Sequence, residues 1–336
     1  REHEGKRRGL KEQEKAQLRF LLKKAAREGV QKCDVVTGTL QQAHIPIVRE
    51  QNCIFCVIEE AGLVTEEVAH LALATAPKQL LIIGDEKQMS ARVMDRTVEK
   101  MKTLPLFHRL IRLKHIPRVV LRQQRRFPPM IMNLVSELLY EGQLIDDPAT
   151  TAARLRDNTA SGIWVDPSRP VVSINSSNKQ SQPEGQTSWC NEGDADLCVD
   201  LVRRILEESN GMFREEDITI LTFYKAQVTC LKEKLDNNVN VGCTAECANT
   251  VDKFQGMENK IVIISTVKSK LTSSDFIKNG GRINVSLTRC THGLILVGNE
   301  EVMKQLSSEW KFTIDRLKET GQNLRILNSE VPQSAV

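Results

Sequence analysis

The sequence predicts an α/β protein whose strands are parallel and whose chain forms two domains. Short apolar runs alternate along the chain with amphipathic stretches of helical period, which is typical of strand–helix–strand units. The runs are apolar at nearly every position, as buried parallel strands are when helices cover both faces of their sheet. With 336 residues, the chain is long enough to give each domain a core of its own.

The first predicted domain begins with a helix and continues with strands and helices in alternation. Leu18, Leu21 and Leu22 recur at helical spacing among Lys and Glu residues, so they predict one apolar helix face. Thr65 is suited to cap a later helix. The expected elements are, in order, a helix over residues 11–28, strands over Cys33–Thr39 and Ile54–Ile58, a helix over Glu66–Leu73, and a strand over Gln79–Ile83.

The second predicted domain shows the same alternation, interrupted by a polar stretch. Residues 146–193 are rich in Asp, Ser, Asn, Gln and Pro, and residues 175–188 are expected to form a surface loop. The expected elements are a strand over Val119–Leu121, a helix over Pro129–Leu139, a strand over Val171–Ile174, a helix over Asp194–Glu208, and strands over Ile218–Leu221, Ile261–Thr266 and Leu294–Val297.

Composition limits the classes of partner and the compartment. The formal net charge of +4 permits a nucleic-acid partner without requiring one. No apolar stretch approaches the roughly 20 residues that span a bilayer, so no membrane partner is expected. Cys53 and Cys56 have a spacing that zinc sites use, but they lie in an apolar run without a His pair, so no structural zinc is expected. Nine scattered cysteines, interpreted as packed thiols, indicate a reducing compartment, either cytoplasmic or nuclear.

Five short segments, in a fixed order, carry the residue types that a nucleotide-driven motor requires. Such a motor needs a divalent metal, a base for the attacking water, a sensor for the γ-phosphate, and cations that neutralise the transition state. Each segment alone is a weak signal, because an acidic pair can simply begin a helix and a glycine segment can simply end a strand. The segments are Ile58–Gly62, Gly84–Gln88, Gln124–Pro129, Val251–Glu258 and Arg282–Arg289.

This set of segments resembles the motifs of superfamily 1 helicases, most closely the branch that includes the nonsense-mediated-decay RNA helicase. The resemblance implies two RecA-like domains of parallel-sheet α/β fold, with ATP in the cleft between them. No G-x-x-x-x-G-K-[ST] phosphate loop (Walker A) is present in the sequence. The chain is therefore expected to be the C-terminal portion of a longer helicase, with its first domain truncated at the N-terminus. The missing N-terminal half of the helicase core is then an expected partner.

The resemblance also divides the chain into regions. The first domain is expected to contain the Walker B and G-D-x-x-Q motifs, and the second is expected to be the C-terminal, AAA-type domain of the helicase. The expected regions are a helical stalk remnant over residues 1–28, the C-terminal part of RecA-like domain 1 over residues 29–110, RecA-like domain 2 over residues 111–328, and a disordered tail over residues 329–336.

In the first domain, an apolar strand leads into the acidic pair Glu59 and Glu60. The resemblance implies that Glu60 is the catalytic base and that Glu59 holds Mg²⁺ through water. The family has Asp at the position of Glu59, and the longer Glu side chain can weaken the octahedral geometry that Mg²⁺ demands. The resemblance further implies that Gln88 senses the γ-phosphate and that Asp85 belongs to the same nucleotide-binding segment.

In the second domain, Arg126 and Arg289 align with the two arginine fingers of the family. A guanidinium suits this role because it is planar, permanently charged and bidentate toward phosphate. Arg125 replaces the Tyr that packs on adenine in the family, although arginine also stacks on aromatic rings. Glu258 fits the family's contact with the ribose hydroxyls. The other residues implied to bind the cofactor are Gln124, Gln255 and Gly256.

Four residues at strand ends match the family's contacts with the nucleic-acid backbone: Thr222, Tyr224, Ser265 and Thr266. For Thr222 and Tyr224, a strand end with a packed aromatic ring is an alternative interpretation of the same pattern.

The resemblance implies an ATP-dependent helicase or translocase that uses ATP and Mg²⁺ and acts on single-stranded RNA or DNA, with RNA favoured. The alternative is a catalytically impaired, RNA-binding scaffold of helicase fold, which Glu59, Arg125 and the absent phosphate loop favour. Without that loop, this chain by itself is expected to be inactive. A kinase or GTPase is excluded because such enzymes carry a phosphate loop of their own.

Overall fold

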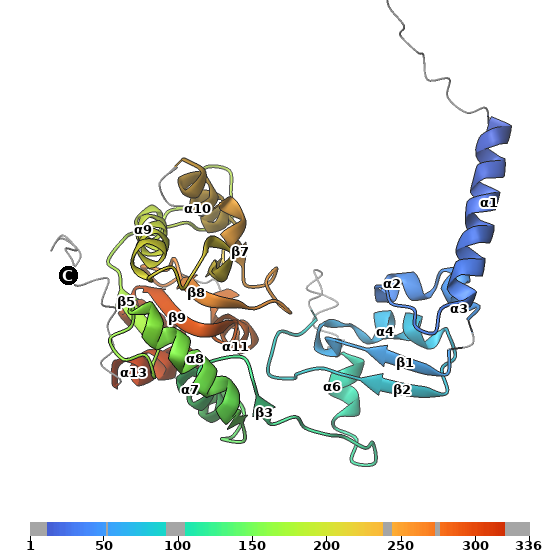
Figure 1. Cartoon of the computed structure of the whole chain (residues 1–336), viewed down its shortest axis with the longest axis horizontal. Helices are drawn as coiled ribbons and strands as arrows, with labels where there is room; N and C mark the ends of the chain where they lie inside the picture. Colours follow the sequence, from blue (N-terminus) through green and yellow to red (C-terminus); the bar gives the residue numbers. More distant parts are fainter. Residues whose placement is uncertain (1–11, 52, 92–104, 238–243, 273–275, 320–336) are drawn as a thin grey trace, which may run out of the picture. The chain divides into compact units, whose positions relative to one another are not determined.

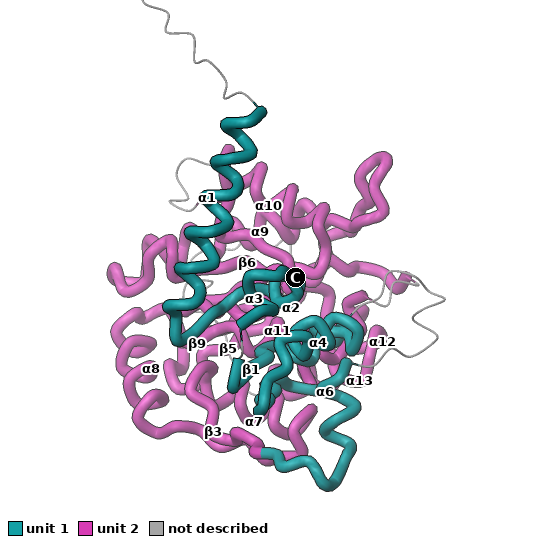
Figure 2. The backbone as a smooth tube through the Cα atoms, turned by 90° about the vertical axis from the view of Figure 1, so that its right-hand side faces the viewer, with its two compact units in different colours: residues 1–86, 90–118 teal, residues 87–89, 119–336 magenta. Residues whose placement is uncertain are grey.

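The structure is a computed structural model that describes residues 12–51, 53–91, 105–237, 244–272 and 276–319. The chain forms two compact units, shown in different colours in Figure 2. Unit 1 comprises residues 1–86 and 90–118, and unit 2 comprises residues 87–89 and 119–336. The predicted tail and the first part of the predicted stalk lie outside the described residues. The predicted domain boundaries stay predictions.

Unit 1 is built around a small parallel sheet. Strands β1 and β2 pair in register from Phe55↔Gln79 to Ile58↔Ile82. One face packs on α4 and α6 through the cluster Ile58, Ala61, Ala69, Ala72 and Leu106. The elements are α1 (Glu12–Gln31), α2 (Leu40–Ala43), α3 (Pro46–Arg49), β1 (Phe55–Ile58), η1 (Ala61–Leu63), α4 (Glu66–Leu73), β2 (Gln79–Ile82) and α6 (Leu106–Leu110).

The other face of this sheet is exposed. Phe55, Val57 and Leu81 are 52%, 46% and 44% exposed, although all three are apolar. Parallel sheets are ordinarily covered on both faces, and sheets of only two strands are marginal in water. Unit 1 therefore presents an apolar sheet face that the described residues do not bury.

Two predicted strands are wrong, one in unit 1 and one at the start of unit 2. Residues 33–39 and 119–121, all described, have no strand conformation. Val119 and Leu121 are 88% and 87% exposed. A strand forms only where a neighbour supplies hydrogen bonds, and the local apolar pattern does not reveal whether that neighbour exists. The predicted helix at residues 11–28 is confirmed as α1, but none of its residues is buried.

Unit 2 contains a five-stranded sheet in which every pairing is parallel, in the order β5-β9-β8-β6-β7 (Figure 1). Its elements are β3 (Gln123–Gln124), α7 (Pro129–Leu139), β4 (Ile145–Asp146), α8 (Pro148–Ser161), β5 (Val171–Asn175), α9 (Glu192–Glu208), η2 (Glu215–Asp217), β6 (Ile218–Thr222), α10 (Lys225–Asn237), η3 (Ala245–Cys247), β7 (Ala248–Thr250), β8 (Asn259–Ser265), η4 (Phe276–Lys278), α11 (Gly280–Leu287), β9 (Cys290–Gly298), α12 (Glu300–Leu306) and α13 (Ser308–Glu319).

Helices cover both faces of this sheet. Successive residues of each strand point to opposite faces, so β5, β6, β8 and β9 each contribute to two apolar clusters. Ile264 and Leu296 pack in the cluster that contains Ile131 of α7, together with residues of α11 and α13. Ile263 belongs to the cluster that contains Leu201 of α9, together with residues of α10. The predicted α/β class with parallel sheets is confirmed. In the described part of the chain, no helix is long and apolar enough to cross a membrane.

The sequence did not predict α8, because residues 148–161 are mostly polar and include three Thr residues. Its two ends are nevertheless marked by residues that favour helix starts and helix ends. The side chain of Asp147 accepts hydrogen bonds from the backbone of Ala149 and Thr150, with Pro148 at the first helical position. Gly162 follows in the left-handed conformation, with φ of 72°.

Candidate functional site

The acidic pair and the glycine segment of unit 1 follow neighbouring strands. Glu59 and Glu60 come directly after β1, and Asp85 comes shortly after β2. The backbone N–H of Ile83 donates to the carbonyl of Ile58 at 2.8 Å, and the strands are parallel. The carboxyl ends of the two strands therefore meet at one edge of the sheet, which is where α/β proteins hold their ligands.

The turn after β1 has an uncommon backbone. Glu60 has φ of 49°, in the left-handed region that few residues other than Gly adopt, and such positions cluster at functional sites. Gly84 lies close to this turn, because a Cβ at Gly84 would stand 3.2 Å from the nitrogen of Gly62 and 3.3 Å from the ring of Phe107. The two turns are thus packed closely together, and glycine at position 84 permits that approach.

In unit 2, the predicted finger Arg126 lies on a loop that the side chain of Gln124 organises. The Oε1 atom of Gln124 accepts the backbone N–H groups of Arg126 and Phe127 at 2.9 and 3.0 Å. Its Nε2 atom donates to the carbonyl of Phe127 at 2.9 Å and to the side chain of Asp146. Gln124, which the family resemblance placed among cofactor-binding residues, therefore serves the loop itself in this structure.

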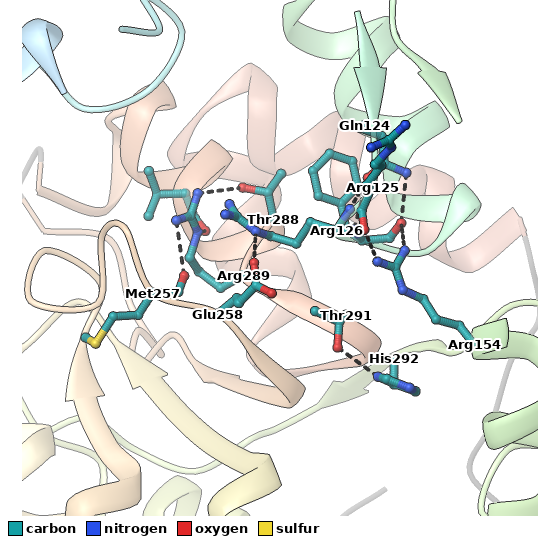
Figure 3. A network of polar contacts seen from close by, with 12 residues as sticks. Gln124, Arg125, Arg126, Arg154, Met257, Glu258, Thr288, Arg289, Thr291 and His292 are labelled. Carbon is teal, nitrogen blue, oxygen red and sulfur yellow. Dashed lines mark hydrogen bonds and ion pairs between the residues drawn. The ribbon is translucent and has the colours of Figure 1, made fainter. Parts of the chain in front are cut away.

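The side chain of Arg126 reaches across to Glu258 and forms an ion pair with it (Figure 3). Both side chains are partly exposed, at 34% and 50%. Two residues that the sequence placed at one nucleotide site, 132 positions apart, are thus in direct contact.

The neighbouring residue, Arg125, turns to a different partner. Its Nε atom donates to the carboxylate of Asp147 at 2.7 Å, although its side chain is 72% exposed. The pKa of Asp147 lies below its usual value, because the N–H of Thr150 and the guanidinium of Arg125 stabilise the charged carboxylate. Asp147 therefore caps α8 and holds Arg125 at the same time.

Arg154, on α8, is a residue of this site that the sequence analysis missed. It is only 9% exposed, and its two terminal nitrogens donate to the carbonyls of Arg125 and Phe127. Burial lowers the pKa of its guanidinium. Its partners are backbone atoms, so no motif in the sequence could have identified it.

The second predicted finger, Arg289, is almost fully buried, at 2% exposure. Its guanidinium donates to the carbonyls of Val285 and Met257 at 3.2 and 3.3 Å. Met257 directly precedes Glu258, so the three segments that carry Arg126, Glu258 and Arg289 converge in one network (Figure 3). Gly256, in the same segment, has φ of 82°, which explains glycine at this position.

An ion pair between a buried arginine and a partly exposed aspartate connects two of the motif segments. Arg282, whose side chain is 4% exposed, donates to both carboxylate oxygens of Asp252, at 3.0 and 2.7 Å. Its guanidinium also lies 3.9 Å from the centre of the Phe276 ring. This pair fixes the start of α11, the helix that leads to Arg289, against the segment that leads to Glu258.

The four predicted nucleic-acid contacts are buried. Thr222, Ser265 and Thr266 are 0% exposed, and Tyr224 is 5% exposed. The hydroxyl of Ser265 accepts from the side chain of Gln227 at 3.1 Å, and that of Thr266 donates to the carbonyl of Val297 at 3.2 Å. Their assigned role stays a prediction, and the conformation described here does not offer these side chains to a ligand.

The predicted nucleotide-binding residues and the predicted nucleic-acid-binding residues lie at opposite ends of the strands in the sheet of unit 2. Glu258 and Arg289 directly precede β8 and β9, whereas Thr222 and Ser265 end β6 and β8. Because all of these strands are parallel, the first two residues are at the amino edge and the last two at the carboxyl edge.

Carboxylates and guanidinia suit a magnesium nucleotide, because Mg²⁺ prefers oxygen ligands and arginine binds phosphate. The carboxylates predicted for this role are Glu59 and Asp85 in unit 1, and the predicted guanidinia are Arg126 and Arg289 in unit 2. Within the described residues, no three His, Cys, Asp or Glu side chains are grouped so that they could hold a metal ion by themselves.

Comparison with known proteins establishes the family. A family model described as an AAA domain matches residues 103–301, and a second model with the same description matches residues 1–96. The chain therefore belongs to the AAA-domain family. It is a member of the superfamily 1 ATP-dependent helicases and resembles the nonsense-mediated-decay branch, as the sequence motifs predicted.

Several curated relatives span most of this chain. Regulator of nonsense transcripts 1 of Dictyostelium discoideum is 28% identical over 86% of the chain and 22% of its own length. The ATP-dependent helicase upf1 of Schizosaccharomyces pombe is 28% identical over 92% of the chain and 33% of its own length. The chain thus spans about a fifth to a third of these relatives. Among solved structures, the PRRSV helicase matches 72% of the chain and 34% of its own chain at 14% identity, with a TM-score of 0.37.

Proposed function

We propose that this chain is part of an ATP-dependent helicase or translocase that moves along single-stranded nucleic acid. The observation that carries the proposal is the convergence of Arg126, Glu258 and Arg289 in one network of unit 2. A motor needs cations that neutralise a phosphoryl transition state and a group that holds the sugar, and these residue types provide both. Opening and closing of two domains around nucleotide then moves the strand.

The residues of unit 1 supply the complementary part of the proposed chemistry. Glu59 would hold Mg²⁺ and Glu60 would orient the attacking water, and Gln88, which ends the glycine segment but belongs to unit 2, would respond to the γ-phosphate. Bound Mg²⁺ supplies positive charge to the phosphate oxygens. Support comes from the placement of Glu59 and Glu60 directly after a parallel strand.

We propose that the exposed sheet face of unit 1 is covered in the working enzyme by a preceding part of the same helicase. That part brings the phosphate loop and further strands for β1 and β2. The exposed Phe55, Val57 and Leu81 support this proposal, as does the length of the relatives, which exceeds that of the chain severalfold.

RNA is the proposed substrate, and the cytoplasm or nucleus the proposed location. The name of one relative, Regulator of nonsense transcripts 1, supports RNA. A helicase-like RNA-binding scaffold of low activity is the second candidate. It is favoured by Arg125, which replaces an adenine-packing Tyr and is engaged by Asp147.

Steady-state hydrolysis of ATP by the full-length protein tests the proposal. Arg126→Ala and Arg289→Ala should each lower kcat by about 10³-fold, in line with arginine-finger magnitudes, while affinity for single strands changes much less. The matched control is Arg169→Ala, an exposed arginine outside the network. Wild-type kcat in either finger variant contradicts the motor and favours the scaffold. The 336-residue chain alone should hydrolyse ATP negligibly, and Mg²⁺-dependent turnover lost on Glu60→Gln would refute that expectation.

A further inference from the structure

We propose that Arg154 is the positioning residue of the arginine finger: its guanidinium holds the loop that carries Arg126, and it contributes to catalysis only through that loop. This inference rests on the proposed function, in which Arg126 acts on the nucleotide. Arg154 follows Arg126 by 28 positions in the sequence. It lies on α8 and belongs to none of the motif segments.

The geometry assigns this role. Arg154 donates through Nη1 to the carbonyl of Phe127 at 3.2 Å and through Nη2 to the carbonyl of Arg125. These carbonyls belong to the two residues that flank Arg126, so one guanidinium bridges the loop on both sides of the finger (Figure 3). A planar fork with fixed N–H directions can make two such bonds at once.

The opposite side of the loop is held by Gln124, which binds the N–H groups of Arg126 and Phe127. Arg154 and Gln124 together bind the carbonyls of residues 125 and 127 and the N–H groups of residues 126 and 127. The loop backbone is thus fixed by side chains rather than by a strand or helix.

The start of α8, the helix that carries Arg154, also makes hydrogen bonds to the loop. The N-cap residue of α8, Asp147, holds Arg125, and Asp146 binds both Gln124 and the hydroxyl of Thr151. Asp146 and Asp147, which directly precede α8, and Arg154 within it therefore contact the segment that carries Arg126. Displacement of α8 would displace the finger.

Arg154 does not reach a ligand directly, because it is 9% exposed and its terminal nitrogens are bonded to backbone carbonyls. Burial of a charged group is unfavourable unless hydrogen bonds compensate, and here the compensation comes from the loop. A Lys ammonium at the same position lies on a shorter stem and lacks the fixed fork by which the guanidinium binds both carbonyls.

A double-mutant cycle in the full-length protein tests whether Arg154 acts through Arg126. Arg154→Met should lower kcat by about 10- to 100-fold while KM for ATP changes less than about 3-fold, because a misplaced catalytic group costs rate rather than ground-state binding. Arg154→Lys should give a smaller loss. In an Arg126→Ala background, Arg154→Met should change kcat by less than about 2-fold. Arg156→Met, an exposed arginine on the same helix, is the matched control.

Amide hydrogen exchange in the 336-residue chain provides a readout that does not need hydrolysis. Arg154→Lys and Arg154→Met should accelerate exchange at Arg126 and Phe127 by about 10-fold or more, without changing exchange in β8. Unchanged exchange at both amides overturns the inference. So does an equal loss of kcat on Arg154→Met in the wild-type and Arg126→Ala backgrounds. Failure of the proposed function is distinct, because it appears as wild-type kcat in Arg126→Ala alone.

Discussion

Replacement of Arg282 by Met removes the ion pair with Asp252 that connects two motif segments of unit 2. The guanidinium makes two hydrogen bonds to Asp252, at 3.0 and 2.7 Å, and lies 3.9 Å from the ring centre of Phe276. Met is about as long as the aliphatic stem of Arg, so the substitution deletes the guanidinium with its charge and bonds while retaining the packing of the stem.

The expected loss of stability follows from these contacts. Hydrogen bonds to charged groups contribute about 1.5–3 kcal/mol each, and the contact with the Phe276 ring about 1 kcal/mol. Two effects reduce this sum. The Asp252 side chain is 39% exposed, so its carboxylate regains water, and the cost of burying Arg282 disappears. The net loss in the free energy of unfolding is therefore about 2–4 kcal/mol.

Urea unfolding followed by tryptophan fluorescence measures this loss in unit 2 alone. The chain has three tryptophans, and the two most buried, Trp164 and Trp310, are 1% and 0% exposed in unit 2. The control is Arg203→Met, because Arg203 pairs with Asp200 and Glu207 on an exposed helix surface and should lose less than about 1 kcal/mol. An unfolding midpoint for Arg282→Met as high as that of the control would refute the assigned importance of the pair.

Three further predictions concern other contacts. Gly293→Ala should lower the free energy of unfolding by about 1–3 kcal/mol, because its Cβ would stand 2.1 Å from a Trp164 ring carbon. Gly29→Ala in α1 should not lower it, and equal midpoints of urea unfolding for the two variants would contradict this prediction. Burial lowers the pKa of Lys268 from 10.5 to about 8, so the unfolded chain binds more protons between these values; stability relative to Lys268→Met should rise with pH across that window, and a flat difference would contradict the shift. Affinity of the chain for single strands should fall with salt at a slope of roughly −0.7 per phosphate contact in anisotropy titrations, and independence from salt would exclude a phosphate-binding groove.

The sequence predicted the sheet of unit 2 well, because buried parallel strands leave continuous apolar runs. Ile218–Leu221 and Leu294–Val297 lie within β6 and β9, and the helix predicted at Pro129–Leu139 is α7. The same rule gave wrong strands at Cys33–Thr39 and Val119–Leu121. Pairing is non-local, so an apolar run shows that a strand is possible and not that a neighbouring strand is present.

At the candidate site, the sequence could identify side chains by type and order but not their contacts. The pairing of Arg126 with Glu258 spans 132 positions. Arg154 binds carbonyl groups, which every residue type carries, so nothing in the sequence distinguishes it from other arginines. The burial of Ser265 and Thr266 was equally hidden, because a hydroxyl at a strand end can face a ligand or a neighbouring backbone group.

The finger loop combines a fixed backbone with a releasable side chain. The pair between Arg126 and Glu258 is partly exposed, and such pairs contribute only about 0–1 kcal/mol. The bonds from Arg154 to the loop are buried and charge-assisted, so each is stronger. Under the proposed function, phosphate can therefore displace Glu258 from the finger at small cost while the loop stays in place. Glu258→Gln should accordingly free Arg126 without loosening the loop, whereas Arg154→Met should loosen the loop. Hydrogen exchange at Phe127 separates the two cases, and acceleration by Glu258→Gln equal to that by Arg154→Met would contradict this division of roles.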